Sequence, residues 1–290
     1  MRSLRLGILL GPVAWLAVVG AVWGALQTYA GVGPGGIGVS LVAGTAVWAS
    51  VGLLVSAWGR WRERAAIASG VSGVRPADGA HSVLVGTLEP TGRPLSAPLD
   101  GAPCVAYRYE IIDDRGRGRR RHIATVYRGT AITPSLIVTP TGSYRLLAVP
   151  DIEGREPSGT RDEMVARFQA YAATTTFLDR SQSAGELVTR WDDADGEYRS
   201  DVAYDTPAPG DTDHWMFVQR HVPPGSRVCV FGLFSESRGG IVAGAHPTRL
   251  IVGSPEQVME SLQSLVRVRA VLGVIAAIVA AGSVFLFLGA

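Results

Sequence analysis

Three apolar runs without a charged residue constrain the fold of this 290-residue chain more than any other feature. They cover about residues 6–26, 40–58 and 270–288. Each is about 20 residues long, which at about 1.5 Å per residue is enough for a helix to cross a hydrocarbon layer of about 30 Å. Inside lipid every backbone amide must be bonded within its own segment. The sequence therefore predicts three transmembrane helices.

The arginines beside these runs predict which side of the membrane holds the middle of the chain. They precede the first run, follow the second and precede the third, at Arg2, Arg5, Arg60, Arg62, Arg64, Arg267 and Arg269. Neither the Gly-rich connector over 27–39 nor the tail after the third run has a basic residue. By the positive-inside rule, the N-terminus and the central region are cytoplasmic. Trp58 and Trp61 alternate with these arginines, so we expect both tryptophans and the arginines from Arg60 onward at the membrane interface.

A cleaved signal peptide over residues 1–24 is an alternative, because two arginines followed by an apolar run also fit that template. The long run and the lack of an A-x-A site favour a multi-pass protein of the cell membrane. We expect an N-terminal transmembrane hairpin over 1–64, a linker over 65–82, a soluble domain over 83–265 and a C-terminal transmembrane helix over 266–290.

The central region has the pattern of a β-rich domain. Val83–Leu88 and Cys104–Ile112 are predicted strands joined by a polar loop, and the second alternates with the period of a sheet that has one wetter face. Further strands flank turn signals near residues 113–122, 140–142, 195–196 and 223–225, and a short last strand covers 249–252.

Two helices are predicted beside these strands. Thr160 and Glu163 form a capping box before an amphipathic helix with the stripe Met164, Val165, Phe168, Tyr171 and Ala172. A second helix starts at Ser254-Pro255-Glu256-Gln257 and meets no breaker before the third apolar run. The predicted fold class is α+β: three transmembrane helices plus a β-rich soluble domain with one or two amphipathic helices.

The composition argues against several kinds of chemistry. All 27 basic residues are Arg, which removes a Schiff-base or P-loop lysine. Two Cys and five His are fewer than the eight ligands of a RING-type double zinc site, and no G-x-S-x-G is present. A net charge of +2 gives no nucleic-acid footprint. We therefore predict no catalytic residue, no metal site, no cofactor and no nucleic-acid partner.

Two weaker alternatives involve the cysteines. Cys104 with His122 could act as nucleophile and base, and His221 with Cys229 could form a small metal site across the Pro-Pro-Gly turn. Ordinary buried strand residues explain both pairs better, because a free Cys is among the most buried residue types.

An arginine cluster is the one positive functional signal. Its members, at the tip of the hairpin predicted over 104–127, are Arg115, Arg117, Arg119, Arg120 and Arg121. Near a membrane each could contribute roughly 1 kcal/mol to binding anionic head groups. The alternative is a solvated tip balanced by Asp113 and Asp114. The expected partners are the lipid bilayer and an unidentified protein on the cytoplasmic side, and a homo-oligomer stays open.

Two blocks of sequence carry a family resemblance. VLVGTLEP is followed by PLSAPLDGAPCVAYRYEI, and VPPGSRVCVFGLFSESRGGIV is followed by a helix that enters an apolar run. Over about 83–265 the chain resembles the GIDE family, also called the BAM (beside-a-membrane) domain of membrane-embedded E3 ubiquitin ligases, although the middle diverges. The best-known members have two spans, so the predicted N-terminal hairpin departs from them.

The resemblance implies a membrane-anchored module. Members in mitochondria and chloroplasts carry a C-terminal RING that transfers ubiquitin, and this sequence contains none. We therefore expect a non-enzymatic interaction or sensing module that binds a membrane-proximal partner or lipid. The alternative from another class is an E3 ubiquitin ligase-like component of a transfer system. A small-ligand pocket within the β-rich domain is a third hypothesis.

Overall fold

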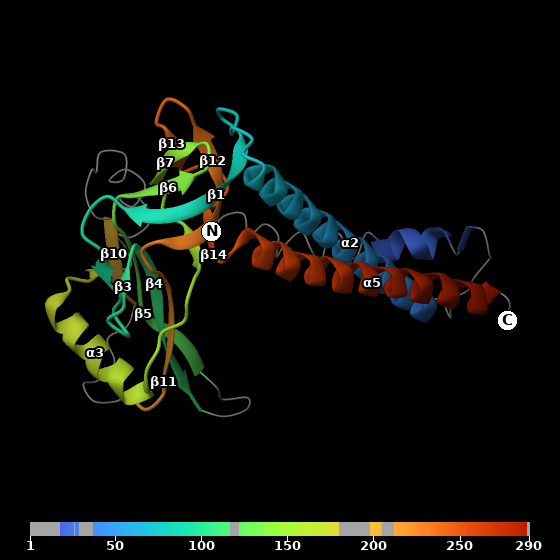
Figure 1. The fold of residues 1–290 in the computed structure, drawn as a ribbon. Coiled ribbons are helices and arrows are strands. Elements are labelled where there is room, and N and C mark those ends of the chain that lie inside the picture. Colours follow the sequence, from blue (N-terminus) through green and yellow to red (C-terminus); the bar gives the residue numbers. More distant parts are fainter. Residues whose placement is uncertain are drawn as a thin grey trace. The chain divides into compact units, whose positions relative to one another are not determined.

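A computed structural model describes residues 18–25, 27–28, 37–116, 122–179, 198–204 and 212–288. It divides the chain into two units (Figure 1). The helical unit comprises Met1–Ala65 and Met259–Ala290, and the β-rich unit is Ala66–Val258. The chain is thus α+β, as the sequence predicts.

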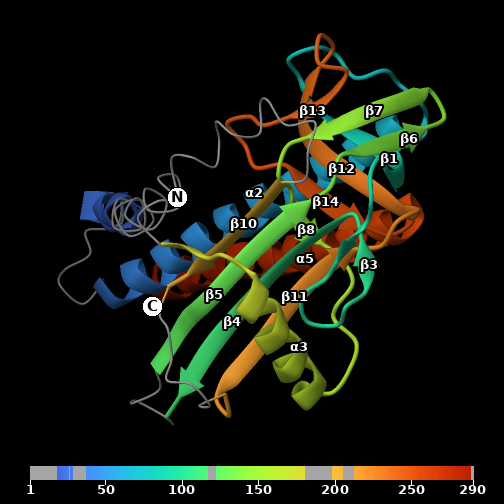
Figure 2. The same cartoon turned by 90° about the vertical axis from the view of Figure 1, so that its left-hand side faces the viewer.

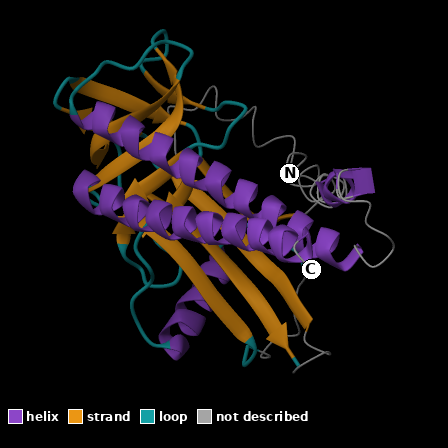
Figure 3. Ribbon diagram, turned by 90° about the vertical axis from the view of Figure 1, so that its right-hand side faces the viewer, coloured by secondary structure: helices purple, strands orange, loops and turns teal. Residues whose placement is uncertain are grey.

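Two long helices dominate the helical unit, α2 (Ile37–Val71) and α5 (Pro255–Leu288). Each is one unbroken helix (Figure 3). Ser40–Val71 and Pro255–Phe285 are long and apolar enough to cross a membrane, which gives two such helices among the described residues rather than the three expected. Residues 18–25 are also helical, and the rest of the first apolar run, up to residue 17 and at 26, lies outside the described residues.

The sequence explains where α5 begins and what limits α2 near its end. α5 begins with the predicted cap: the Gln257 amide donates to Ser254 Oγ at 3.3 Å, and the Ser254 amide donates to Gln257 Oε1 at 3.1 Å. α2 continues to Val71, into the segment for which the sequence predicts a linker. Gly70 meets the next strand so closely that a Cβ there would lie 2.8 Å from the Val83 carbonyl oxygen.

A small closed barrel forms one half of the β-rich unit. In chain order its first three strands form an antiparallel meander, the third pairs in parallel with the fifth, and the fourth pairs with the first. This is the Greek-key connectivity of an OB-fold. The strands are β1 (His81–Pro90), β6 (Ser135–Thr139), β7 (Gly142–Leu147), β12 (Ser226–Ser235) and β13 (Gly240–Val242). Two more strands extend the sheet from β12: β14 (Arg249–Val252), then β8 (Asp151–Glu153).

A second, five-stranded sheet comes from two insertions into this barrel, one between β1 and β6 and the other between β7 and β12. Its spatial order is β11 (Trp215–Val222), β4 (Ala106–Arg115), β5 (His122–Ile132), β10 (Tyr198–Ala203) and β9 (Leu178–Asp179). Helix α3 (Arg161–Thr174) covers one face (Figure 2). A two-stranded ladder, β2 (Leu95–Ser96) with β3 (Pro103–Cys104), precedes β4.

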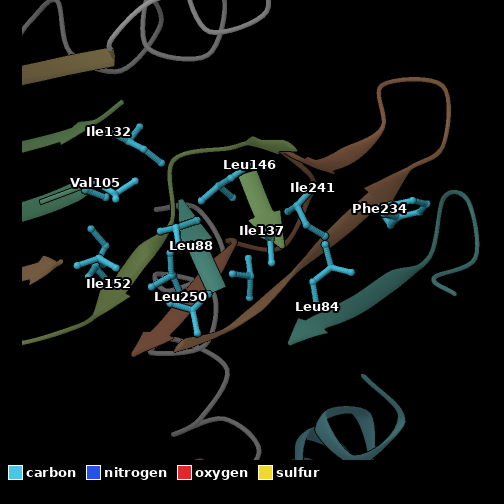
Figure 4. Packing of buried hydrophobic residues seen from close by; sticks show 14 residues of the cluster. Leu84, Leu88, Val105, Ile132, Ile137, Leu146, Ile152, Phe234, Ile241 and Leu250 are labelled. Carbon is cyan, nitrogen blue, oxygen red and sulfur yellow. The ribbon is translucent and has the colours of Figure 1, made fainter. Parts of the chain in front are cut away.

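Each half has its own core. The first core contains apolar side chains of the barrel strands, among them Leu84, Leu88, Ile137 and Ile241, together with Leu250 of β14 (Figure 4). The second core lies between the five-stranded sheet and α3, where Phe168 packs against the rings of Tyr109, Tyr127, Tyr171 and Trp215. The predicted helical stripe is confirmed for four of its five members, because Met164, Tyr171 and Ala172 pack with Phe168 on the same core.

The predicted strands are mostly present, but their partners differ from what adjacency suggests. The hairpins β4–β5 and β6–β7 are confirmed. β1 and β4 lie in different sheets, and so do β11 and β12 on either side of the Pro-Pro-Gly turn. The turn connects two sheets because the Gly225 amide donates to the Leu88 carbonyl of the barrel, at 3.0 Å. The first strand and the turn of the hairpin predicted around residues 195–196 lie outside the described residues. Its second strand is β10, which pairs with β5 and β9.

Candidate functional site

About two turns of α2 in the helical unit carry the interface residues predicted on this helix. The rings of Trp58 and Trp61 stack with centroids 4.9 Å apart, and both are exposed. Arg60 forms an ion pair with Glu63 at 3.0 Å. Arg62 is exposed and Arg64 is half-buried. Tryptophans and arginines grouped at one level of a helix are typical of a membrane interface.

α5 brings its own arginines to this level. Arg269 donates a hydrogen bond to Ser56, two residues before Trp58 on α2, and Arg267 is exposed. Beyond these residues the outward side chains of both helices are apolar and exposed, among them Val51, Val55, Ile275, Ile278 and Phe285. Such surfaces mark contact with lipid or with another protein. The helical unit also has a cleft of about 620 Å³ lined by small and apolar side chains, including Ala43, Val47, Ala277 and Ala281.

Of the arginine cluster, only Arg115 is placed. Its Nε donates to Asp113 Oδ2 at 2.6 Å, and it pairs in register with His122 where β4 and β5 end. Arg117, Arg119, Arg120 and Arg121 lie outside the described residues. Arg115 and His122 lie at the end of the β4–β5 hairpin that is farthest from the barrel, since Ala106 and Ile132 pair at the other end.

Next to this end, the sheet face opposite α3 carries exposed apolar side chains that sequence reasoning missed. Ile123, Met216 and Val218 are 56%, 48% and 41% exposed. Met216 lies directly opposite the half-buried Ile112 in the register of β11 with β4. We call these four residues the distal patch. The signal in the sequence was the run Trp215–Val218, because four consecutive apolar residues in a strand place apolar side chains on both faces of the sheet.

A buried polar network lies on the α3 side of the same sheet. Gln219 accepts from the Leu99 amide at 2.9 Å and donates to Asp100 Oδ1 at 3.0 Å. His221 Nδ1 lies 3.8 Å from Asp100 Oδ2 and has no hydrogen-bond partner. Burial lowers the pKa of His221, with Arg155 acting in the same direction and Asp100 opposing it. Burial at this position therefore favours the neutral form of the imidazole.

Three tyrosines and Asp201 form a second buried network. The hydroxyls of Tyr109 and Tyr171 donate to Asp201 Oδ1 at 2.7 and 2.9 Å, and the Tyr107 and Tyr171 hydroxyls lie 3.0 Å apart. Burial and the adjacent Asp201 raise the pKa of Tyr171 to about 12. A Cβ on Gly129 would lie 2.2 Å from this carboxylate, so only glycine leaves it room. Satisfied buried networks of this kind fix one packing arrangement.

The cysteine alternatives do not form a reactive site. Cys104 and Cys229 are fully buried, and burial raises the pKa of their thiols to about 12 and about 11. The proposed Cys104–His122 pair is wrong, because His122 is at the far end of a hairpin that spans roughly 30 Å at about 3.3 Å per residue. His221 and Cys229 belong to different sheets. Within the described ranges no three His, Cys, Asp or Glu side chains form a group that could hold a metal ion.

No family model, no curated protein and no solved structure matches this chain.

Proposed function

We propose that the chain is a membrane-anchored, non-enzymatic interaction or sensing module of the GIDE/BAM kind. Three transmembrane helices hold its β-rich domain on the cytoplasmic side of a cell membrane, where the domain binds a membrane-proximal partner or lipid. The distribution of arginines supports this sidedness, and the exposed apolar surfaces of α2 and α5 support the anchoring.

One observation carries the proposal: the two apolar helices continue into strands that flank the same barrel strand. β1 follows α2, β14 precedes α5, and both pair with β12. Val85 and Ile251 lie on opposite sides of Cys229 in this register. Because β1 and β14 both pair with β12, a displacement of one helix relative to the other would change the strand pairing on β12. Such coupling suits a sensor or an adaptor more than a hydrolytic enzyme.

Photo-crosslinking of the full chain in native membranes tests the interaction role. A photoreactive amino acid is placed at one exposed position of the domain at a time, for example at Met216, at Gln169 on α3 and at Arg93. We expect one position to give a discrete adduct after illumination while the others, which serve as matched controls, give none. An absence of adducts at every surface of the domain would contradict a binding module.

The E3 ligase-like alternative makes a different prediction. The sequence has no Lys, so modification of its own side-chain amines by ubiquitin is excluded and an acceptor protein with lysines must be supplied. We expect no transfer to such an acceptor in the presence of activating and conjugating enzymes. The Cys104→Ala/Cys229→Ala double variant should show the same crosslinking pattern as the wild type, because neither buried thiol takes part.

A further inference from the structure

We propose that the cleft in the helical unit binds an uncharged quinone, whose carbonyl accepts a hydrogen bond from the Ser50 hydroxyl. This inference rests on the proposed function and names a ligand for the membrane-spanning part of the module. The cleft has a volume of about 620 Å³, within the range of about 300–1,000 Å³ that is typical of small-molecule sites. Its lining comes from the helical segment 18–25, from α2 between residues 43 and 51, and from α5 between residues 277 and 285.

Close contacts at glycines bound this cleft near both of its ends. A Cβ on Gly44 would lie 2.8 Å from the Cα of Val19, and one on Gly273 would lie 3.1 Å from the Cγ of Leu54. Glycines at such positions let membrane helices approach closely. Between these contacts small side chains leave space open, among them Ala43, Ala277, Ala280 and Ala281.

Ser50 provides the polar group of the cleft. Among the described residues that line it, the others are all apolar. Ser264 and Ser283, both on α5, donate to carbonyl oxygens of their own helix at 2.8 and 2.9 Å. Ser50 differs from them: it is only 6% exposed, and in the described part of the chain its hydroxyl has no hydrogen-bond partner. A buried hydroxyl without a partner is unfavourable, so a ligand that brings an acceptor oxygen removes this cost.

The depth of Ser50 decides the class of ligand. Ser50 lies eight residues before Trp58, which corresponds to about 12 Å along the helix. With Trp58 and Trp61 at the interface, Ser50 is close to the middle of a hydrocarbon core about 30 Å thick. The ester carbonyls of a phospholipid stay near its head group and do not reach this depth. The described lining carries no charge, so the acceptor belongs to an uncharged compound that dissolves in hydrocarbon, as a quinone does.

The shape of the cleft favours a ring over a single chain. Its lining spans about 12 Å along α2 and along α5, so the mean cross-section is roughly 50 Å², more than one extended acyl chain fills. Phe285 lines the cleft and is 78% exposed, so its ring is available to stack on a planar ligand.

A ligand in this cleft contacts both of the long helices. α2 precedes β1, α5 follows β14, and these two strands pair with β12. Binding would therefore act on the two helices whose strands flank β12, which gives the sensing role a defined input.

Two matched compounds test this proposal on the full chain in lipid nanodiscs. Duroquinone is a fully methylated benzoquinone, so it has no open ring position at which a thiol could add. Durene is the same methylated ring without the carbonyl groups. Equilibrium dialysis measures how much of each compound is bound above the amount that empty nanodiscs take up. We expect saturable binding of one duroquinone per chain and about fivefold weaker binding of durene.

Variants separate the hydroxyl from the cleft. Ser50→Ala should weaken duroquinone binding about fivefold and leave durene binding unchanged, whereas Ser50→Thr, which keeps the hydroxyl, should retain it. Ser264→Ala removes a hydroxyl that already has a partner, so this matched control should change neither. Ala281→Leu should abolish the binding of both compounds because it fills the cleft. Val279→Leu, at an exposed position of α5 outside the lining, should not.

The outcomes distinguish this inference from the proposed function. If duroquinone binding does not exceed that of empty nanodiscs while the chain resists extraction from membranes by alkaline carbonate, the quinone site is overturned and the membrane-anchored module stands. A chain that carbonate releases has no membrane anchor, and both proposals then fail. Equal binding of duroquinone and durene, or full binding by Ser50→Ala, would overturn the hydrogen bond. Full binding by Ala281→Leu would overturn the cleft as the site.

Discussion

At the residue scale, His221 is the most informative side chain of the β-rich unit. Its Nδ1 is buried without a hydrogen bond, 3.8 Å from Asp100 Oδ2, while the Asp100 oxygens accept from Gln219 and from the Ala102 and Ser158 amides. The backbone of His221 exchanges two hydrogen bonds with the backbone of Arg155, which fixes the position from which the ring extends. A neutral imidazole in this position costs little, whereas a charged one is poorly solvated.

This environment makes stability sensitive to acid. The folded pKa of His221 lies below its ordinary value of 6.5, so the unfolded chain binds more protons there between the two pKa values. Stability due to this group is complete above about pH 6.5 and is lost as the pH falls from there towards the folded pKa. We expect urea midpoints of the full chain in detergent to fall less between pH 7.5 and 5.5 in His221→Asn than in the wild type. His122→Asn, at an exposed site, should behave as the wild type, and equal slopes in all three proteins would contradict the account.

The two thiols provide a second prediction at this scale. Cys104 and Cys229 are fully buried and their raised pKa values keep them protonated at neutral pH. We expect no reaction with a thiol reagent in the native protein over a time in which an exposed thiol reacts completely, and two labelled thiols per chain after denaturation. Rapid modification of either thiol in the folded protein would refute this assignment.

Much at this scale could be predicted from composition, and the rest depended on packing. The absence of lysine and the small number of cysteines and histidines are visible in the sequence. The preference for ordinary buried strand cysteines follows from the general burial of free thiols. The Asp100, Gln219 and His221 network could not be found, because Asp100 lies 119 residues from Gln219 in sequence and they meet only in the folded chain.

At the element scale, α3 is stabilised both by its local sequence and by its packing on the sheet. Its capping box satisfies two amides at the helix start: the Glu163 amide donates to Thr160 Oγ1 at 3.4 Å, and the Thr160 amide donates to Glu163 Oε2 at 3.0 Å. Phe168 then anchors the helix on the sheet among four aromatic rings. Both features were predicted because they depend on spacings of three and four residues.

Removing the cap tests the local contribution. Thr160→Ala leaves the Glu163 amide without its side-chain acceptor, so we expect the free energy of unfolding to fall by about 1 kcal/mol. Chemical unfolding of the full chain in detergent, followed by near-ultraviolet circular dichroism, measures it. Thr174→Ala, at the other end of α3, is the matched control and should have a smaller effect. A loss equal to that of the control would show that the cap contributes nothing.

Strand partners were harder to predict than strands. The β4–β5 and β6–β7 hairpins follow from alternation around a turn, which is a local signal. β11 looks like the first strand of a hairpin with β12, yet Val222 pairs with Ala106 and Val228 pairs with Gly86. The Pro-Pro-Gly turn redirects the chain from one sheet to the other. A two-residue or three-residue turn motif cannot show this, because the competing partners are more than a hundred residues away.

At the scale of the whole molecule, the β-rich unit is a barrel with two insertions that meet in one sheet. The insertion after β1 supplies the β4–β5 hairpin. The insertion after β7 supplies α3 and the strands β10 and β11, and these two strands pair with the two sides of that hairpin. The barrel connectivity alone assigns no activity, because one fold serves many functions. The fold class was predictable from hydrophobic periods, whereas this interleaving needed long-range pairings that no local pattern encodes.

Sidedness is the central claim at this scale, and cysteine accessibility tests it most directly. Full-length Gln169→Cys carries one exposed thiol on the β-rich unit, while the native cysteines are buried. Intact cells that produce the variant and inside-out vesicles from the same cells are treated with a membrane-impermeant maleimide. We predict labelling in the inside-out vesicles and none in intact cells. Labelling in intact cells would place the domain outside and contradict the cytoplasmic, membrane-anchored module proposed above.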